Sequence, residues 1–283
     1  MELPELDLLN PAGVALHPVE VHLLCTFAEV EAPFPLEVAT ASTSDEERAV
    51  LFHHAAATLI ERDLADEQGP LGVAEEFAYL LGHCSGVVDL VVDRGGAGRL
   101  GVAMLVAGND ALLVTQDAAD PHGALRMLAA PFDDAVSRLC RVLPTAEAPR
   151  TAPFSIPKKS AQAIFEVMVD RMPDDDGESP REPRPLTQQE LDRLLADHGI
   201  DEQVLRRMTT ALHPVEGSGQ VGLARRSPST EDQWQRVGDE LAWVDTPKGR
   251  FRLATEDDSW ISVNPLAQDD LRSAVRGLAQ RAR

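Results

Sequence analysis

Histidine, cysteine and aspartate side chains occur at three places where catalysis or metal binding is conceivable. His53 and His54 are adjacent in a stretch of helical periodicity, so their side chains point about 100° apart and cannot easily share a metal ion. His83 and Cys84 could act as a base and a nucleophile, but no third group is identified to orient them. Three aspartates at 174–176 could hold a hard cation, yet the prolines around them indicate a solvated linker. We therefore expect no catalytic residues, no metal site and no cofactor.

A glycine-rich stretch, Arg94-Gly-Gly-Ala-Gly98, follows an apolar run in the way that a phosphate-binding loop would. It lacks the Gly-Lys-Ser/Thr ending of such loops, and the sequence after it favours a strand instead of a helix. The stretch therefore predicts a connection between two strands, and its glycines could equally serve only as a flexible turn.

Composition and charge narrow the class of protein. The 283 residues are 43% hydrophobic and 26% charged, which is typical of a soluble globular protein of one or two domains. The formal net charge is -21 and the pI is about 4.7. Nucleic acid and anionic membranes would be repelled by such a surface, so neither is expected as a partner.

Cysteine usage and the absence of long apolar runs point to the cytoplasm. Cys25, Cys84 and Cys140 are odd in number and lie in or beside apolar runs, which favours buried thiols in a reducing compartment over a disulfide framework. Residues 1–7 lack the features of a signal peptide. No window of 18 uninterrupted apolar residues occurs, so no membrane span is expected.

The first half of the chain reads as helices followed by strands. Val19, Leu23, Phe27 and Val30 form one apolar stripe, which predicts a short amphipathic helix. A capping box of Thr43 and Glu46 begins a second helix. The further predicted elements are an edge strand at 36–39, a helix at 71–84, strands at 87–92, 100–107 and 111–115, and a helix at 122–143 that is interrupted or kinked at Pro131.

The second half repeats this order after a proline- and alanine-rich connector at 144–157. A helix is expected at 158–172, and the charged, proline-rich segment 173–185 should be mobile. Helices are then predicted from the capping box of Thr187 and Glu190 to Gly199 and from Asp201 to Leu212. Four β segments lie between 219 and 263, and Asn264 and Pro265 are expected to begin a terminal helix.

Comparison of the two halves predicts the fold. Both contain two helices, then strands, then a helix, so we expect an α/β protein of the α+β type. Its central antiparallel sheet would be shared by two lobes related by a pseudo-twofold axis and flanked by helical bundles. The expected lobes are residues 1–144 and 187–283, with a connector at 145–186.

Three stretches in the second half resemble the EspG family of chaperones associated with ESX (type VII) secretion. They are Gly219-Gln-Val-Gly-Leu-Ala-Arg-Arg226, Trp243-Val-Asp-Thr-Pro-Lys-Gly-Arg-Phe251 and Trp260-Ile-Ser-Val-Asn-Pro265. They are similar to the family's first C-terminal strand, its D-T-x-x-G-R hairpin and its last strand before the final helix. The resemblance implies a cytosolic chaperone without enzymatic activity, which binds the tip of a PE–PPE heterodimer and delivers it to the secretion machinery.

The resemblance also implies where the partner would bind. The family's partner surface combines the loop between the first two strands, the central sheet and the C-terminal helical pair. Carried over to this sequence, these parts give the following partner-binding residues: Arg94, Gly95, Gly96 and Arg99 in the loop, Gln220, Leu223 and Arg225 in the sheet, and Leu194, Leu205 and Met208 in the helical pair. The loop is shorter and richer in glycine than the family pattern. Each of the three apolar residues in the helical pair could also be an ordinary core residue.

Two other classes of function stay open at this point. One is a non-enzymatic scaffold or interaction module, which could be a homodimer built through an edge of the sheet. The other is a hydrolase that uses Cys84 or His83. The client, the secretion system that it belongs to and the oligomeric state cannot be read from these residues.

Overall fold

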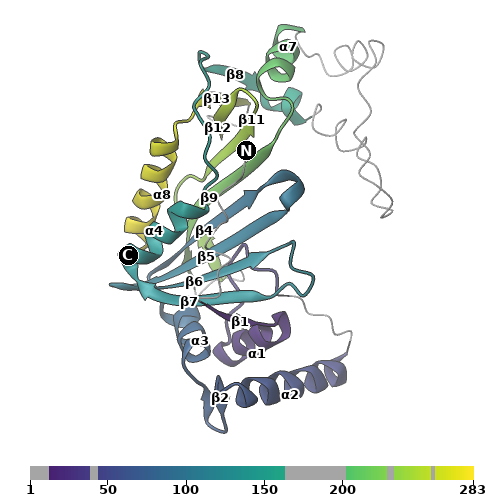
Figure 1. Cartoon of the computed structure of the whole chain (residues 1–283), viewed down its shortest axis with the longest axis vertical. Helices are drawn as coiled ribbons and strands as arrows, with labels where there is room; N and C mark the ends of the chain where they lie inside the picture. Colours follow the sequence, from purple (N-terminus) through teal and green to yellow (C-terminus); the bar gives the residue numbers. More distant parts are fainter. Residues whose placement is uncertain (1–12, 39–43, 163–201, 228–232, 256–258) are drawn as a thin grey trace. The chain divides into compact units, whose positions relative to one another are not determined.

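The structure, a computed structural model, describes residues 13–38, 44–162, 202–227, 233–255 and 259–283. It contains an antiparallel sheet of 11 strands flanked by helices, so the predicted mixed α/β class is confirmed (Figure 1). The chain divides into two compact units, which we describe separately. The first unit comprises residues 1–145, 217–242 and 268–283, and the second comprises 146–216 and 243–267.

Six strands of the first unit are hydrogen-bonded in the order β1-β7-β6-β5-β4-β9, and β10 pairs with β9. β4 lies between two long partners: it pairs along its whole length with β5 and over seven residues with β9. Its run Val-Val-Asp-Leu-Val-Val is buried on both faces, as expected for a central strand. The strands are β1 (Val14–Leu16), β4 (Gly86–Asp93), β5 (Arg99–Ala107), β6 (Asp110–Asp117), β7 (Leu125–Pro131), β9 (Gly217–Arg226) and β10 (Trp234–Arg236).

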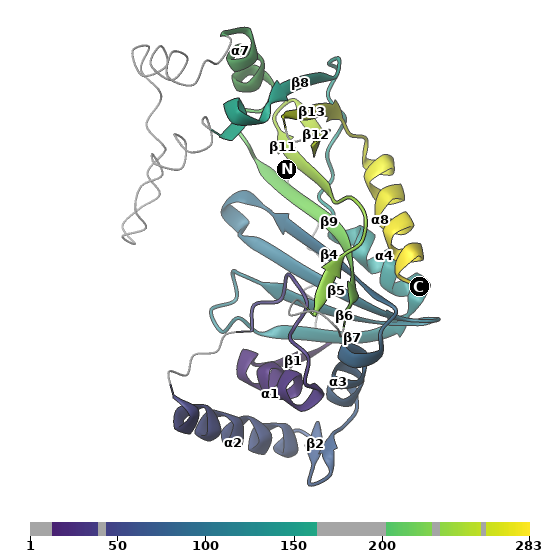
Figure 2. The ribbon, with the colours of Figure 1, turned by 180° about the vertical axis from the view of Figure 1, so that it is seen from behind.

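Helices cover both faces of these strands (Figures 1 and 2). Helices α1 and α3 pack on the face that carries Val87, Leu105 and Leu112, in one apolar cluster. Helices α4 and α8 contact each other and the strands, and α8 lies against β4 and β9. The helices are α1 (Pro18–Ala28), α2 (Asp45–Glu61), α3 (Val73–His83), a 3-10 helix (Gly95–Ala97), α4 (Phe132–Val142) and α8 (Gln268–Ala282), and a small hairpin of β2 (Ala65–Asp66) and β3 (Gly69–Pro70) joins α2 to α3.

The second unit is built on the strand order β11-β12-β13-β8. Its apolar cluster contains Ile156, Phe251 and Val263, against which Met208 packs. The elements are β8 (Phe154–Pro157), α7 (Glu202–Ala211), β11 (Leu241–Thr246), β12 (Gly249–Thr255) and β13 (Trp260–Pro265), the first two residues of β11 belonging to the first unit.

The largest difference from the sequence-based prediction is that residues 122–143 are not one helix. Residues 125–131 form β7, and α4 begins at Phe132. Leu125 and Met127 alternate with Arg126 and turn toward the apolar cluster, so this segment has the period of a strand. Pro131 lies at the N-cap of α4 and separates strand from helix.

Smaller differences concern the ends of elements. The predicted strand at 36–39 is wrong for residues 36–38, which have no regular structure. Helix α2 is capped by the Ser44 hydroxyl, which accepts from the Glu47 N–H at 3.2 Å. The predicted start of the last helix at Asn264 is wrong because Asn264 pairs with Arg252 in the β12–β13 ladder. Predictions that concern residues 163–201, including Leu194, lie outside the described residues.

Two short strands complete the repeat between the halves of the chain. β1 precedes the first helices and pairs with β7, the last strand of its half. β8 likewise pairs with β13, the last strand of its half. Each half therefore uses a short strand from before its helices to cover the edge of its own last strand, which limits unwanted edge-to-edge pairing.

An ion pair crosses the middle of the first unit. Asp89, at the centre of β4, has a side chain only 1% exposed, and it pairs with Arg236 of β10. β9 lies between these two strands and places Gly222 opposite Asp89. A Cβ atom at position 222 would collide with the Arg236 guanidinium, so a side chain there would have to displace the guanidinium from its present position beside Asp89. Arg236 also pairs with Glu240 at 2.5 Å and lies 5.3 Å from the centre of the Phe34 ring.

We expect removal of the arginine to destabilise the first unit. Arg236→Met would leave the Asp89 carboxylate buried without its cation, and the free energy of unfolding should fall by about 3 kcal/mol. The double variant Arg236→Met/Asp89→Leu should recover to within about 1 kcal/mol of the original protein, because it removes both charges. Urea unfolding followed by circular dichroism measures both values. Equal losses in the single and double variants would contradict this account.

Candidate partner-binding surfaces

The loop between β4 and β5, together with Arg99 at the start of β5, contains four of the residues predicted to bind a partner. Gly95 has a φ of 59°, which a glycine adopts without strain, and its N–H donates to Asp93 at 2.9 Å. Arg94 donates to the carbonyl oxygens of Ala97 and Gly98 and pairs with Asp117 at 2.8 Å. The Arg94 guanidinium is therefore engaged in closing its own loop and is mostly buried.

The exposed residues of this connection are Gly95, Gly96, Ala97 and Arg99. The Arg99 side chain is 46% exposed, and its distance of 3.7 Å from Glu37 is long for an ion pair. A pair of this kind contributes little to stability, so the Arg99 guanidinium can exchange Glu37 for another acceptor. The loop thus offers the Arg99 guanidinium beside a surface of small residues, Gly95, Gly96 and Ala97.

The three predicted residues of β9 lie on opposite faces of the strands. Gln220 is paired with Val91 and shares its face with Asp89. Leu223 is 1% exposed on the other face, next to Gly86, against which Ala282 of α8 also packs. Arg225 is exposed and donates to the Arg281 carbonyl oxygen at 2.8 Å. Side-chain contacts with a partner are therefore open to Gln220 and Arg225, whereas the Leu223 side chain belongs to the core.

Helix α7 carries the other described candidates, Leu205 and Met208. Met208 is half-buried and packs against the apolar cluster of the second unit. Its packing agrees with the alternative that it is a core residue. Nothing is described for the side chain of Leu205, and Leu194 lies outside the described residues.

The stretch that resembles the D-T-x-x-G-R hairpin has a structural role. Arg250 has no exposed surface, and its guanidinium donates to both carboxylate oxygens of Asp245 at 2.6 and 2.7 Å. It also lies 5.6 Å from the centre of a ring of Trp243. The Thr246 hydroxyl donates to the Gly249 carbonyl oxygen and accepts from the Lys248 N–H. This set of contacts fixes the turn between β11 and β12.

The thiol that was considered for catalysis is not activated. Burial raises the pKa of Cys84 to about 11, so its thiol stays protonated near neutral pH. The neighbouring His83 stacks on Tyr79 with ring centres 4.3 Å apart, and its Nδ1 lies 2.9 Å from the Tyr79 carbonyl oxygen. His53 and His54 have ring centres 6.3 Å apart. Among the described residues, no group of three or more histidine, cysteine, aspartate or glutamate side chains is placed to hold a metal ion.

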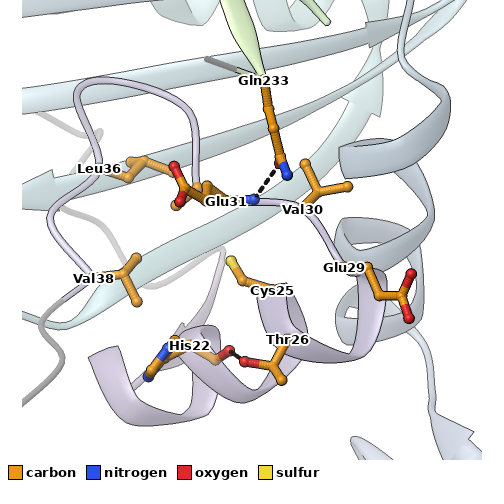
Figure 3. A pocket seen from close by; sticks show the side chains of 10 residues that line it. His22, Cys25, Thr26, Glu29, Val30, Glu31, Leu36, Val38 and Gln233 are labelled. Carbon is orange, nitrogen blue, oxygen red and sulfur yellow. Dashed lines mark hydrogen bonds between the residues drawn. The ribbon is translucent and has the colours of Figure 1, made fainter. Parts of the chain in front are cut away.

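A pocket of about 490 Å³ beside α1 contains another cysteine and histidine (Figure 3). Burial raises the pKa of Cys25 to about 12 and lowers the pKa of His22, so both groups are neutral near pH 7. The Gln233 side chain accepts from the Glu31 N–H at 2.9 Å and ties the wall of the pocket to the segment before β10. None of the residues predicted to bind a partner lines this pocket.

A helix that crosses a membrane must be both long and apolar, and we compared the described helices with this requirement. None of them meets both conditions.

Comparison with known proteins identifies relatives for nearly the whole chain. The model of the EspG family matches residues 17–277. Among solved structures, the chain is similar to EspG5, the type VII secretion system chaperone of Mycobacterium tuberculosis, in complex with a PE25–PPE41 dimer. The TM-score is 0.56 at 11% sequence identity, and the match covers 95% of this chain and 96% of that chain, which shows a shared fold. No curated protein matches the sequence.

We expect Gly249 to be the least replaceable position of the β11–β12 turn. It has a φ of 120°, and a Cβ atom there would collide with the Glu147 carbonyl oxygen and lie 2.9 Å from the Pro149 nitrogen. Gly249→Ala should lower the free energy of unfolding by about 2 kcal/mol through backbone strain. The control is Gly96→Ala, where nothing lies within 4 Å and a change of less than about 0.5 kcal/mol is expected. Chemical denaturation compares the two, and equal losses would show that the turn tolerates a side chain.

Proposed function

Because the chain belongs to the EspG family, we propose that it is a chaperone of type VII secretion that binds PE–PPE-type heterodimers. Its role is to keep such a client soluble and to deliver it to the secretion machinery. The family match over residues 17–277 carries this proposal. The fold shared with EspG5, which was solved with a PE25–PPE41 dimer bound, supports it.

The proposed mode of action is binding without chemistry. A client with an apolar tip needs a carrier that covers this tip and later releases it intact, and an interface of roughly 1,600 Å² with a few buried anchors is sufficient. The raised pKa of Cys84 argues against a hydrolase that uses this thiol. The three free cysteines are consistent with action in the reducing cytoplasm.

The β4–β5 loop is the part of the surface that we propose for client contact. Arg99 offers its guanidinium there, while Gly95 and Gly96 allow a client backbone to approach closely. Arg94 contributes indirectly, because its hydrogen bonds and its pairing with Asp117 hold the loop in shape. Gln220 and Arg225 of β9 are further candidates for contact, on the two faces of the strand.

Co-expression with PE–PPE-type pairs tests the proposal directly. We expect at least one pair to co-purify with this chain as a stoichiometric ternary complex in size-exclusion chromatography. Sedimentation of the chain alone distinguishes a monomeric carrier from a dimerising scaffold. If the folded chain binds no PE–PPE-type pair and dimerises instead, the scaffold is the better description.

A single substitution tests the role of the loop. Arg99→Ala should weaken client binding about tenfold, as expected for an arginine that anchors an interface. Arg48→Ala on α2 is the matched control, because the Arg48 side chain is also 46% exposed and also forms one ion pair with an exposed carboxylate. Calorimetric titration of the client measures both affinities. Equal affinities would exclude Arg99 as a contact.

A further inference from the structure

A second surface of the first unit combines exposed aromatic side chains with carboxylates. It is a groove of about 690 Å³ between the end of α1, the β2–β3 hairpin and α3, which we call the α1–α3 groove. Phe27 is 60% exposed and Tyr79 is 58% exposed, and both line it together with Leu71. Scattered exposed apolar residues are common on protein surfaces, but several that line one concave site mark a binding surface.

The aromatic side chains of the groove are held in place by their surroundings. α1 ends directly after Phe27 and Ala28, because Glu29 adopts a left-handed conformation. The ring of Phe27 approaches Gly69 of the hairpin, where a Cβ atom would lie 3.4 Å from it. Tyr79 is stacked on His83 with an angle of 5° between the rings. Ordered aromatic side chains lose little conformational entropy when a partner binds.

The charge around these side chains is negative. Asp66, Glu75 and Glu76 line the groove, and its described lining residues include no lysine or arginine. Arg226 approaches one end, where its guanidinium donates to the Gly82 carbonyl oxygen at 3.0 Å. Glu75 and Glu76 precede Tyr79 by four and three residues, so they lie near it on the surface of α3. Neither glutamate forms an ion pair in the part of the chain that the structure describes. Burial and the nearby Asp110 raise the pKa of Glu76, so a cation beside this carboxylate would be favourable.

We propose that the α1–α3 groove binds a basic amphipathic helix of a partner protein, with apolar side chains on Phe27, Leu71 and Tyr79 and lysine or arginine beside Glu75 and Glu76. An amphipathic helix that lays its apolar face into a groove is a recurring mode of recognition. A second copy of this chain is disfavoured by its net charge of -21, and an anionic membrane is repelled by the same carboxylates.

The groove is separate from the β4–β5 loop, whereas Arg225, a further candidate for client contact, lies near the end of β4 that adjoins the groove. Gly82 and His83 at one end of the groove precede β4, whereas the loop with Arg99 follows β4. A strand of eight residues spans about 26 Å, so both surfaces can be occupied at once. The inference therefore goes beyond the proposed function and does not depend on it.

The chain contains one tyrosine, which makes the groove directly observable. Incorporation of 3-fluorotyrosine into the full chain gives one fluorine resonance, from Tyr79. The probe is a synthetic helical peptide with leucine and phenylalanine at i, i+3 and i+7 and lysine on both flanks, and the control peptide has glutamate at each lysine position. We expect the lysine peptide to shift the resonance and to bind at least tenfold more tightly than the glutamate peptide.

Variants of the chain complete the test. Phe27→Ser and the double variant Glu75→Gln/Glu76→Gln should each weaken binding of the lysine peptide at least tenfold. Val50→Ser on α2 is the control, because Val50 is 58% exposed but does not line the groove. The double variant keeps its side-chain volumes, so it is informative even if Phe27→Ser does not fold. No shift, equal affinity for both peptides, or unchanged affinity in the double variant overturns the proposal.

One further variant separates this test from that of the proposed function. Arg99→Ala should bind the lysine peptide as the original chain does, whatever its effect on PE–PPE binding. Loss of peptide binding in Arg99→Ala would mean that the peptide occupies the client surface, and this outcome also overturns the proposal.

Discussion

The first unit depends on a buried carboxylate that has to be neutralised across a neighbouring strand. Asp89 interrupts the apolar run of β4 at its centre, where an uncompensated charge would cost several kcal/mol. Arg236 supplies the opposite charge from β10, and its guanidinium passes over Gly222, where the absence of a side chain leaves room for it. The pair thereby favours the observed register of β10 on β9, in which Arg236 lies opposite Ala224. The guanidinium of Arg236 also lies against the Phe34 ring, and this contact helps to position the segment after α1.

The second unit contains a comparable device in the turn between β11 and β12. Arg250 is completely buried, and the carboxylate of Asp245, five residues away, accepts two hydrogen bonds from its guanidinium. These contacts explain why the Trp243–Phe251 stretch has a distinctive sequence motif. Its aspartate, threonine, glycine and arginine each make a specific contact in the turn. The stretch by which the family is recognised therefore reports the fold, and client contacts need not coincide with it.

The parts of the fold that could be predicted from the sequence are those set by local patterns. β4, β5 and β6 are apolar runs separated by glycine-rich connections, and all three lie where they were expected. β1 and β8 have only three and four residues, and each depends on a partner strand far along the chain. Their pairing leaves no local pattern that could have revealed them. The Asp89–Arg236 pair, 147 positions apart, is equally invisible in the sequence.

For the candidate surfaces too, features set by local sequence could be predicted and those set by distant contacts could not. The loop at 94–99 was expected and exists. The ion pair of Arg94 with Asp117 could not be expected, because it depends on how β6 pairs with β5. Helical spacing assigned Phe27 to the apolar stripe of α1, whereas the helix ends one residue later and leaves the ring exposed. Leu223 could not be recognised as a core residue because α8, which contacts β9, comes from the far end of the chain.

The pairing of β4 with β9 has a consequence for biosynthesis. While the chain is being made, one edge of β4 remains without its partner until roughly 120 further residues have been added, which takes a ribosome on the order of 10 s. During this interval a strand with two apolar faces is open to other nascent chains. The chain would then need protection while it emerges from the ribosome, and premature termination before residue 217 would release a fragment with a permanently open edge.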